Sequence, residues 1–269
     1  EDITIAEARA YLQIHADILC LLMDASVQAG AAAAGRSLLS EMKGFVELAK
    51  VRLGENESRV TPVGLYFFGK PGIGKSTLMP LLAKELFPER ESGERFYTKN
   101  MDSEYWEGFR PGTPMVYFDE PHASSGSSVE KFNVSMLSLI SSASCTLNYA
   151  GMTDKGKVKF TCQVVAMSSN LDPTGTLKGL ASASAFRRRM MYWEVVLLPE
   201  FATDAGLIDE KKMNDLSDVD RASLSHLRFL LHEVYDLRTG TSRVTGQYCL
   251  EQMVTIIRAK MYQNEISFD

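Results

Sequence analysis

The sequence has few cysteines, no excess of positive charge and no long apolar run. Its four cysteines form no C-x-x-C pair and are not joined by histidines at zinc-ligand spacing, so we expect reduced thiols and no zinc site. With 29 Lys and Arg against 34 Asp and Glu, the net charge is −5, which excludes a surface that is basic over most of its area. Any nucleic-acid contact must therefore come from a local basic patch or from several subunits together.

Secretory and membrane-spanning segments are also missing from the sequence. The chain starts with acidic residues instead of the basic region of a signal peptide. The apolar run from Ile18 to Met23 is bracketed by Asp17 and Asp24 and is too short to cross a bilayer. We expect a helix packed on protein here, with a helix on a membrane surface as the alternative. The composition favours a cytosolic protein.

The most informative stretch is G-K-P-G-I-G-K-S-T at 69–77, which fits the phosphate-loop pattern G-x-x-x-x-G-K-[ST]. The apolar run 63–68 before it predicts a buried strand, and 78–86 after it predicts a helix. This order would place an anion at a helix N-terminus, where unpaired N–H groups favour it. Lys75 could then reach the β- and γ-phosphates of a nucleotide, and Ser76 could ligate Mg²⁺. The residues expected to bind the nucleotide are Gly69, Pro71, Gly72, Ile73, Gly74, Lys75, Ser76 and Thr77.

Two further buried strands end in polar residues that suit the same chemistry. The run 115–118 ends in Asp119 and Glu120, of which the first would serve Mg²⁺ and the second would orient or deprotonate the attacking water. The run 163–169 ends in Asn170, whose amide can both donate and accept a hydrogen bond. Asn170 could hold the water or the γ-phosphate, or it could simply turn the chain.

Three consecutive arginines, at 187–189, precede the strand expected from Tyr192 onward. A guanidinium that reaches the γ-phosphate of a neighbouring subunit would stabilise charge in the transition state. The alternatives are a basic surface turn or ion pairs with acidic neighbours. The residues alone leave these three interpretations open.

Hydrophobic and turn patterns divide the chain into three parts. Residues 1–58 have a helical pattern, with helices expected over 5–23 and 37–52. Residues 59–200 alternate strand and helix signals, which predicts a three-layer α/β/α sandwich. Residues 201–269 are expected to return to helices.

Three local signals support helices in this C-terminal part. Ser217 to Asp220 resembles a capping box. Gly240 stands where a helix ending near Leu237 would need its C-cap. A last helix is indicated by apolar residues at helical spacing, namely Leu250, Met253, Val254, Ile257 and Met261.

The order of phosphate loop, Asp-Glu strand, Asn strand and arginine cluster resembles superfamily 3 helicases, the compact AAA+ ATPases of small viruses. It is most similar to the 2C-like ATPases of picornavirus-like positive-strand RNA viruses. The segment 59–63 resembles that family's R-x-x-P-V, and 105–109 resembles its Y-F-D-G-Y. The segment 154–156 resembles its E-K-G, and 185–190 its A-x-x-R-R-F, with Arg188 and Arg189 on the two arginines. The resemblance covers about residues 59–198.

The resemblance implies an ATP-hydrolysing ring, usually a hexamer, with ATP and Mg²⁺ bound between subunits. Asp119 would serve the metal, Glu120 the water and Asn170 the γ-phosphate, while Arg188 and Arg189 would act on the neighbouring subunit's nucleotide. The chain would act on single-stranded RNA in viral genome replication as an RNA helicase, together with other viral replication proteins. It would do so in the host cytoplasm at membrane-bound sites, with any membrane contact made by segments outside this chain.

The resemblance also assigns Lys155 and Lys157 to the central pore, where they would contact the RNA backbone; the alternative is a solvated hairpin tip. The last helix could dock on a neighbouring subunit, as similar helices do, or pack on its own domain. The chain departs from the family in having Asp-Glu where many members have Asp-Asp, and in lacking a cysteine-rich zinc element. Two other functions stay open: a membrane-organising or assembly scaffold with an accessory ATPase, and an AAA+ remodeller of proteins.

Overall fold

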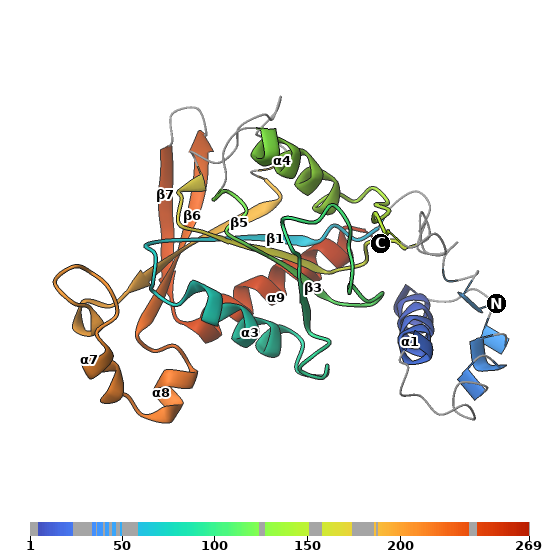
Figure 1. Ribbon diagram of the computed structural model, residues 1–269, viewed down its shortest axis with the longest axis horizontal. Helices are drawn as coiled ribbons and strands as arrows, with labels where there is room; N and C mark the ends of the chain where they lie inside the picture. The colour runs from blue at the N-terminus through green and yellow to red at the C-terminus, as the bar shows by residue number, and fades with distance from the viewer. Residues whose placement is uncertain are drawn as a thin grey trace.

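The structure, a computed structural model, describes residues 5–23, 59–123, 127–150, 158–173, 186, 188–236 and 241–268, with scattered positions between 34 and 49. These residues build one seven-stranded sheet in the order β2-β3-β4-β1-β5-β6-β7 (Figure 1). The strands are β1 (Val63–Phe68), β2 (Phe96–Thr98), β3 (Met115–Asp119), β4 (Val164–Ser169), β5 (Met190–Leu197), β6 (Leu227–Asp236) and β7 (Thr241–Tyr248). Strands β2 to β5 and β1 pair in parallel, whereas β6 and β7 are added antiparallel.

Helices cover both faces of the sheet and make the expected three-layer α/β/α arrangement (Figure 1). The helices are α1 (Ile5–Met23), α3 (Lys75–Leu86), α4 (Ser127–Leu139), α7 (Glu210–Asn214), α8 (Asp218–Ala222) and α9 (Leu250–Ile266), with a 3₁₀ helix at Pro199–Phe201. Successive side chains of β1 point to opposite faces. Leu65 and Phe67 therefore pack with α3 and α9, whereas Tyr66 and Phe68 pack with α4. Burial on both faces explains why β1 is a continuous apolar run.

The expectation of a purely helical region after residue 200 is wrong for β6 and β7. Leu227, Phe229 and Leu231, at every second position, point to the core shared with α9, which is the period of a strand. The strand lies where a helix ending at Gly240 was expected; residues 237–240 themselves lie outside the described residues. The sheet therefore continues past the expected domain boundary at residue 200.

The expected helix start at Ser217 and the last helix are confirmed. Ser217 is the N-cap of α8, and its hydroxyl accepts a hydrogen bond from the backbone N–H of Asp220 at 3.1 Å. The apolar face of α9 is buried against α3 and the sheet of its own chain. Of the two positions considered for this helix, it therefore takes the one on its own domain and not the one on a neighbouring subunit.

The first expected helix is confirmed as α1, whereas the second, over 37–52, falls mostly outside the described residues. Two ion pairs connect α1 to the rest of the chain: Arg9 to Glu265 and Arg90 to Asp17, each at 3.2 Å. Within the described ranges, no helix is both long and apolar enough to cross a membrane.

Arg59, which precedes β1, connects the end of α4 to the segment that leads into β4. Its guanidinium donates to the carbonyls of Ser138 and Leu139 at 2.8 Å each, and to Phe160 and Ala143 at 2.9 and 3.1 Å. The first two are among the last carbonyls of α4, which have no partner within the helix. The guanidinium also lies 4.8 Å from the Phe160 ring centroid. Burial lowers the pKa of Arg59, so this site depends on its hydrogen bonds to hold the charge.

Replacing Arg59 with alanine should lower the free energy of unfolding by about 2–4 kcal/mol, because several carbonyls would lose their charged donor. Urea denaturation of the purified chain measures this change. Arg59→Lys keeps the charge but loses the planar fork, and it should recover only part of the loss. Equal stability of Arg59→Ala and wild type would show that water replaces the guanidinium at no cost.

Candidate active site

The three expected site strands end side by side at one edge of the sheet. β4 lies between β1 and β3 and pairs in parallel with both. The chain leaves β1 through α3 toward β2 on one side, and leaves β4 toward β5 on the other side. Such a reversal of strand order opens a crevice at the carboxyl ends of the strands, where ligands of open α/β sheets bind.

The loop between β1 and α3 has the backbone that a phosphate loop needs. Gly69 has φ +152°, and a methyl group added to it would lie 2.5 Å from the Val195 carbonyl oxygen. Gly74, immediately before α3, has φ +91°, in the left-handed region that favours glycine. Lys75 is the first residue of α3, so the unpaired N–H groups of the helix start face the loop. These amides and the positive end of the helix dipole suit an anion.

Lys75 connects the phosphate loop to Asn170. Its ammonium group donates to the carbonyls of Gly69 at 3.0 Å and Lys70 at 2.8 Å, and to Asn170 Oδ1 at 2.7 Å. An ammonium group only donates, so the amide oxygen of Asn170 must face it and the amide nitrogen points elsewhere. Burial lowers the pKa of Lys75, whereas the nearby carboxylates of Glu120 and Asp119 act in the opposite direction. Asn170 is thus more than a turn residue, because its side chain contacts the lysine of the loop.

Glu120 leaves β3 in a strained conformation that turns it toward Asn170. Its φ of +44° is in the left-handed region, which costs a residue other than glycine about 1–3 kcal/mol. Its N–H donates to the Ser168 carbonyl at 3.1 Å, and its Oε2 accepts from the Asn170 N–H at 3.1 Å. The Glu120 carboxylate is therefore held beside Asn170, the residue whose side-chain amide contacts Lys75.

Asp119 is oriented by two buried hydroxyl groups that the sequence interpretation missed. Its Oδ1 accepts from the Tyr117 hydroxyl at 2.6 Å and from Ser168 Oγ at 2.8 Å. A tyrosine two residues before a carboxylate lies on the same face of a strand, and this spacing was the available signal. Burial raises the pKa of Tyr117, and its bond to Asp119 adds to this, so the hydroxyl is protonated and donates.

Ser76 and Asp119 fit a magnesium ion in the chemistry of their donors. Both present the hard oxygen atoms that Mg²⁺ prefers. Ser76 is the second residue of α3, directly after the phosphate loop, and Asp119 ends β3 at the same edge of the sheet.

The structure does not bring Arg188 and Arg189 to the site of their own chain. Arg188 is exposed and Arg189 is half-buried, just before β5. Met190 of β5 pairs with Gly64 at the start of β1. Gly69 lies five residues further along, about 17 Å at the rise of a β-strand. The two arginines thus lie at the opposite edge of the sheet; Arg187 is outside the described residues.

Lys155 and Lys157 also lie outside the described residues. The segments on either side pair antiparallel, with a bridge between Thr146 and Lys159 and a 2.9 Å hydrogen bond from the Leu147 N–H to the Val158 carbonyl. This pairing forms the base of a hairpin, as the sequence interpretation expected for this segment.

The connection between β5 and β6, residues 198–226, carries α7 and α8 and reaches the phosphate loop. A methyl group added to Gly72 would lie 3.8 Å from Leu207 Cδ2, and one added to Gly206 would lie 2.7 Å from Lys70 Nζ. Because the turn around Leu207 and the phosphate loop lie this close, this turn forms one wall beside the phosphate loop. No sequence motif indicated this contact.

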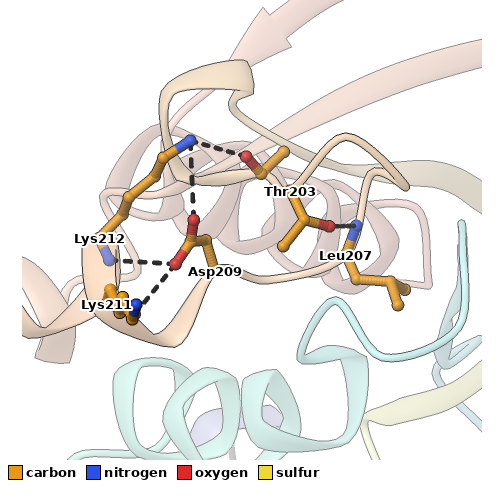
Figure 2. A network of polar contacts seen from close by, with 6 residues as sticks. Thr203, Leu207, Asp209, Lys211 and Lys212 are labelled. Atoms are coloured by element: carbon orange, nitrogen blue, oxygen red, sulfur yellow. Dashed lines mark hydrogen bonds and ion pairs between the residues drawn. The ribbon is translucent and has the colours of Figure 1, made fainter.

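A polar network fixes this turn to α7 (Figure 2). The Leu207 N–H donates to Thr203 Oγ1 at 3.2 Å. Asp209 caps α7 by accepting from the Lys211 and Lys212 N–H groups at 3.0 and 3.4 Å. Lys212 Nζ lies 3.8 Å from Asp209 Oδ2 and donates to the Ala202 carbonyl at 2.8 Å.

Residues 65–171 match a protein-family model described as RNA helicase. The RNA1 polyprotein of Cowpea mosaic virus (strain SB) is 33% identical over 158 residues, which are 55% of this chain and 8% of that polyprotein. The replicase polyprotein of Acute bee paralysis virus (strain Rothamsted) is 30% identical over 146 residues, 50% of this chain and 8% of the polyprotein. The chain thus spans less than a tenth of the curated relatives that it matches.

Among solved structures, the apo NrS-1 C-terminal region is similar with a TM-score of 0.37 and 21% identity, over 68% of this chain and 38% of that one. A likeness at this level supports no functional conclusion. The sequence matches and the site geometry are consistent with each other without this structural likeness. The resemblance to superfamily 3 helicases is thus confirmed: the central part of this chain matches the RNA helicase family model, and similar curated proteins are polyproteins of picornavirus-like viruses.

Proposed function

We propose that this chain is a Mg²⁺-dependent nucleoside-triphosphatase that hydrolyses ATP at an inter-subunit site of an oligomeric ring. The observation that carries the proposal is the convergence of Lys75, Asn170 and Glu120 at the carboxyl edge of the sheet. A cation for phosphates, an amide and a carboxylate base, of which the first and the last both contact Asn170, are the groups that water attack on a phosphoryl group requires.

The bound nucleotide would replace the partners that Lys75 has now. Its ammonium group would turn from the Gly69 and Lys70 carbonyls to the β- and γ-phosphates, while the loop amides bind the remaining oxygens. Mg²⁺, held by Ser76 and Asp119, would neutralise charge on the phosphate oxygens. The Asn170 amide nitrogen, which points away from Lys75, would donate to the γ-phosphate or hold the water.

Hydrolysis would be an in-line attack of water on the γ-phosphorus. The water oxygen forms a bond to phosphorus while the bond from phosphorus to the β–γ bridging oxygen breaks. Glu120 accepts the proton of the water, and ADP leaves with the bridging oxygen. The strained backbone of Glu120 keeps its carboxylate beside Asn170 and thus beside the γ-phosphate.

The position of the arginines supports a site that two copies of the chain complete. Arg188 and Arg189 lie at the edge of the sheet opposite to their own phosphate loop, so they could stabilise transition-state charge only at a neighbour's nucleotide. Head-to-tail contacts of this kind close into rings. We propose a hexamer, with Lys155 and Lys157 in its pore on single-stranded RNA.

Mixing two inactive variants tests this shared site. Lys75→Ala and Arg188→Ala should each be inactive alone, whereas an equal mixture should regain part of the ATPase activity. In the mixture, an intact Lys75 of one chain meets an intact Arg188 of the next. Arg110→Ala, which changes an exposed arginine outside the 187–189 cluster, is the matched control and should behave as wild type. A mixture as inactive as its parts, or an active Arg188→Ala, would contradict the shared site; Arg189→Ala shows which arginine acts.

The relatives suggest where the activity is used. Their printed names are viral RNA1 and replicase polyproteins, and the matching family is described as RNA helicase. We therefore propose a role in RNA replication beside other viral replication proteins in the host cytoplasm, with membrane contact through segments outside this chain.

A further inference from the structure

We propose that Tyr117 is a positioning residue for the Mg²⁺ site: its buried hydroxyl orients the Asp119 carboxylate so that the second carboxylate oxygen can ligate the ion. This inference rests on the proposed function, because the ion is needed only if the site binds a nucleoside triphosphate. Nothing in the phosphate-loop pattern or in the Asp-Glu pair requires a tyrosine at this position.

The contacts of Tyr117 form a closed polar cluster in an otherwise apolar part of the sheet. Its hydroxyl lies 2.6 Å from Asp119 Oδ1 and 2.7 Å from Ser168 Oγ, and Ser168 Oγ lies 2.8 Å from the same Asp119 oxygen. Tyr117 is 4% exposed and Ser168 is 1% exposed. The two hydroxyls are therefore shielded from water, whereas Asp119 is exposed at the end of β3.

The direction of the hydrogen bonds follows from counting protons. A carboxylate only accepts hydrogen bonds, so the Tyr117 proton goes to Asp119 Oδ1. Ser168 Oγ donates to the same oxygen, so both hydroxyl protons of the cluster are directed to Oδ1.

This direction leaves one oxygen of Asp119 available for a cation. The bonds to Asp119 both go to Oδ1, so Oδ2 lies outside the network. The Tyr117 hydroxyl thus orients an expected metal ligand, as outer-shell partners of metal ligands do.

The test is the Mg²⁺ dependence of nucleotide binding by Tyr117→Phe, a change that removes one oxygen and keeps the ring. Binding of a fluorescent ATP analogue is titrated with Mg²⁺ and is also measured in EDTA. We expect the Mg²⁺ concentration for half-saturation to rise about 10- to 100-fold. Binding in EDTA and the free energy of unfolding should change little, because phosphate-loop contacts do not involve Tyr117.

The matched control is Tyr149→Phe, which also removes a hydroxyl donor, here to the Phe109 carbonyl at 2.7 Å. It should leave the Mg²⁺ dependence unchanged. Ser168→Ala removes the other donor to Asp119 and should raise the Mg²⁺ requirement too, which keeps the test valid if Tyr117→Phe folds poorly.

The outcomes separate this inference from the proposed function. An unchanged Mg²⁺ requirement in Tyr117→Phe and Ser168→Ala, or an equal loss of binding in Mg²⁺ and EDTA, would make the hydroxyls merely structural. Failure of the wild-type chain to bind the analogue at any Mg²⁺ concentration would overturn the proposed function and this inference together.

Discussion

Replacing Lys75 with alanine should lower the rate of ATP hydrolysis at least about 100-fold, because the cation that offsets phosphate charge is lost. Lys75 is 6% exposed and its three donors are all directed into the site. Its removal also frees Asn170 Oδ1, so the amide would no longer be held in one orientation. Nucleotide binding should weaken as well, which titration with a fluorescent ATP analogue measures.

Lys84 offers the matched control for this change. It lies on the same helix, α3, but is exposed in its last turn. Lys84→Ala should keep wild-type binding and hydrolysis. If Lys75→Ala retained near-wild-type turnover, the loop would not be the phosphate site and the family-based account of the chemistry would be wrong.

Replacing Glu120 with glutamine should leave ATP binding intact and slow hydrolysis about 10²- to 10⁴-fold, the usual contribution of a general base. The glutamine amide can still accept the hydrogen bond from the Asn170 N–H, so the local structure should persist. A neutral amide cannot accept the proton of the attacking water. Binding by the fluorescent analogue and single-turnover hydrolysis separate the two effects.

Glu85→Gln, on the exposed side of α3, removes an equal charge outside the site and should have no effect. Loss of ATP binding in Glu120→Gln would show that Glu120 is structural, with its strained backbone serving the fold instead of the reaction. Unchanged hydrolysis in Glu120→Gln would show that another group accepts the proton of the attacking water.

The parts of the site that local sequence patterns encode could be predicted. The phosphate loop is one continuous motif between an apolar strand and a helix, and β1 and α3 are found there. Asp119 and Asn170 each end a buried run, and parallel strands bring such ends to one edge. The contact between Lys75 and Asn170 depends on the strand order of the sheet, which places β4 beside β1.

The parts that depend on pairing between distant segments could not be predicted. The leucine-rich run 227–231 fits a helix or a strand by composition, and its partner β5 decides for the strand. Tyr117 gains its role only through the register that places Ser168 opposite Asp119. The turn around Leu207 reaches the phosphate loop through space, without any motif.

The most direct measurement is the initial rate of phosphate release from ATP by the purified wild-type chain in Mg²⁺, beside Lys75→Ala and Glu120→Gln. We expect steady release by the wild type, a rate per chain that rises with protein concentration as the shared site forms, and background rates for both variants. Wild-type release no faster than that of Lys75→Ala at every protein concentration would contradict this expectation.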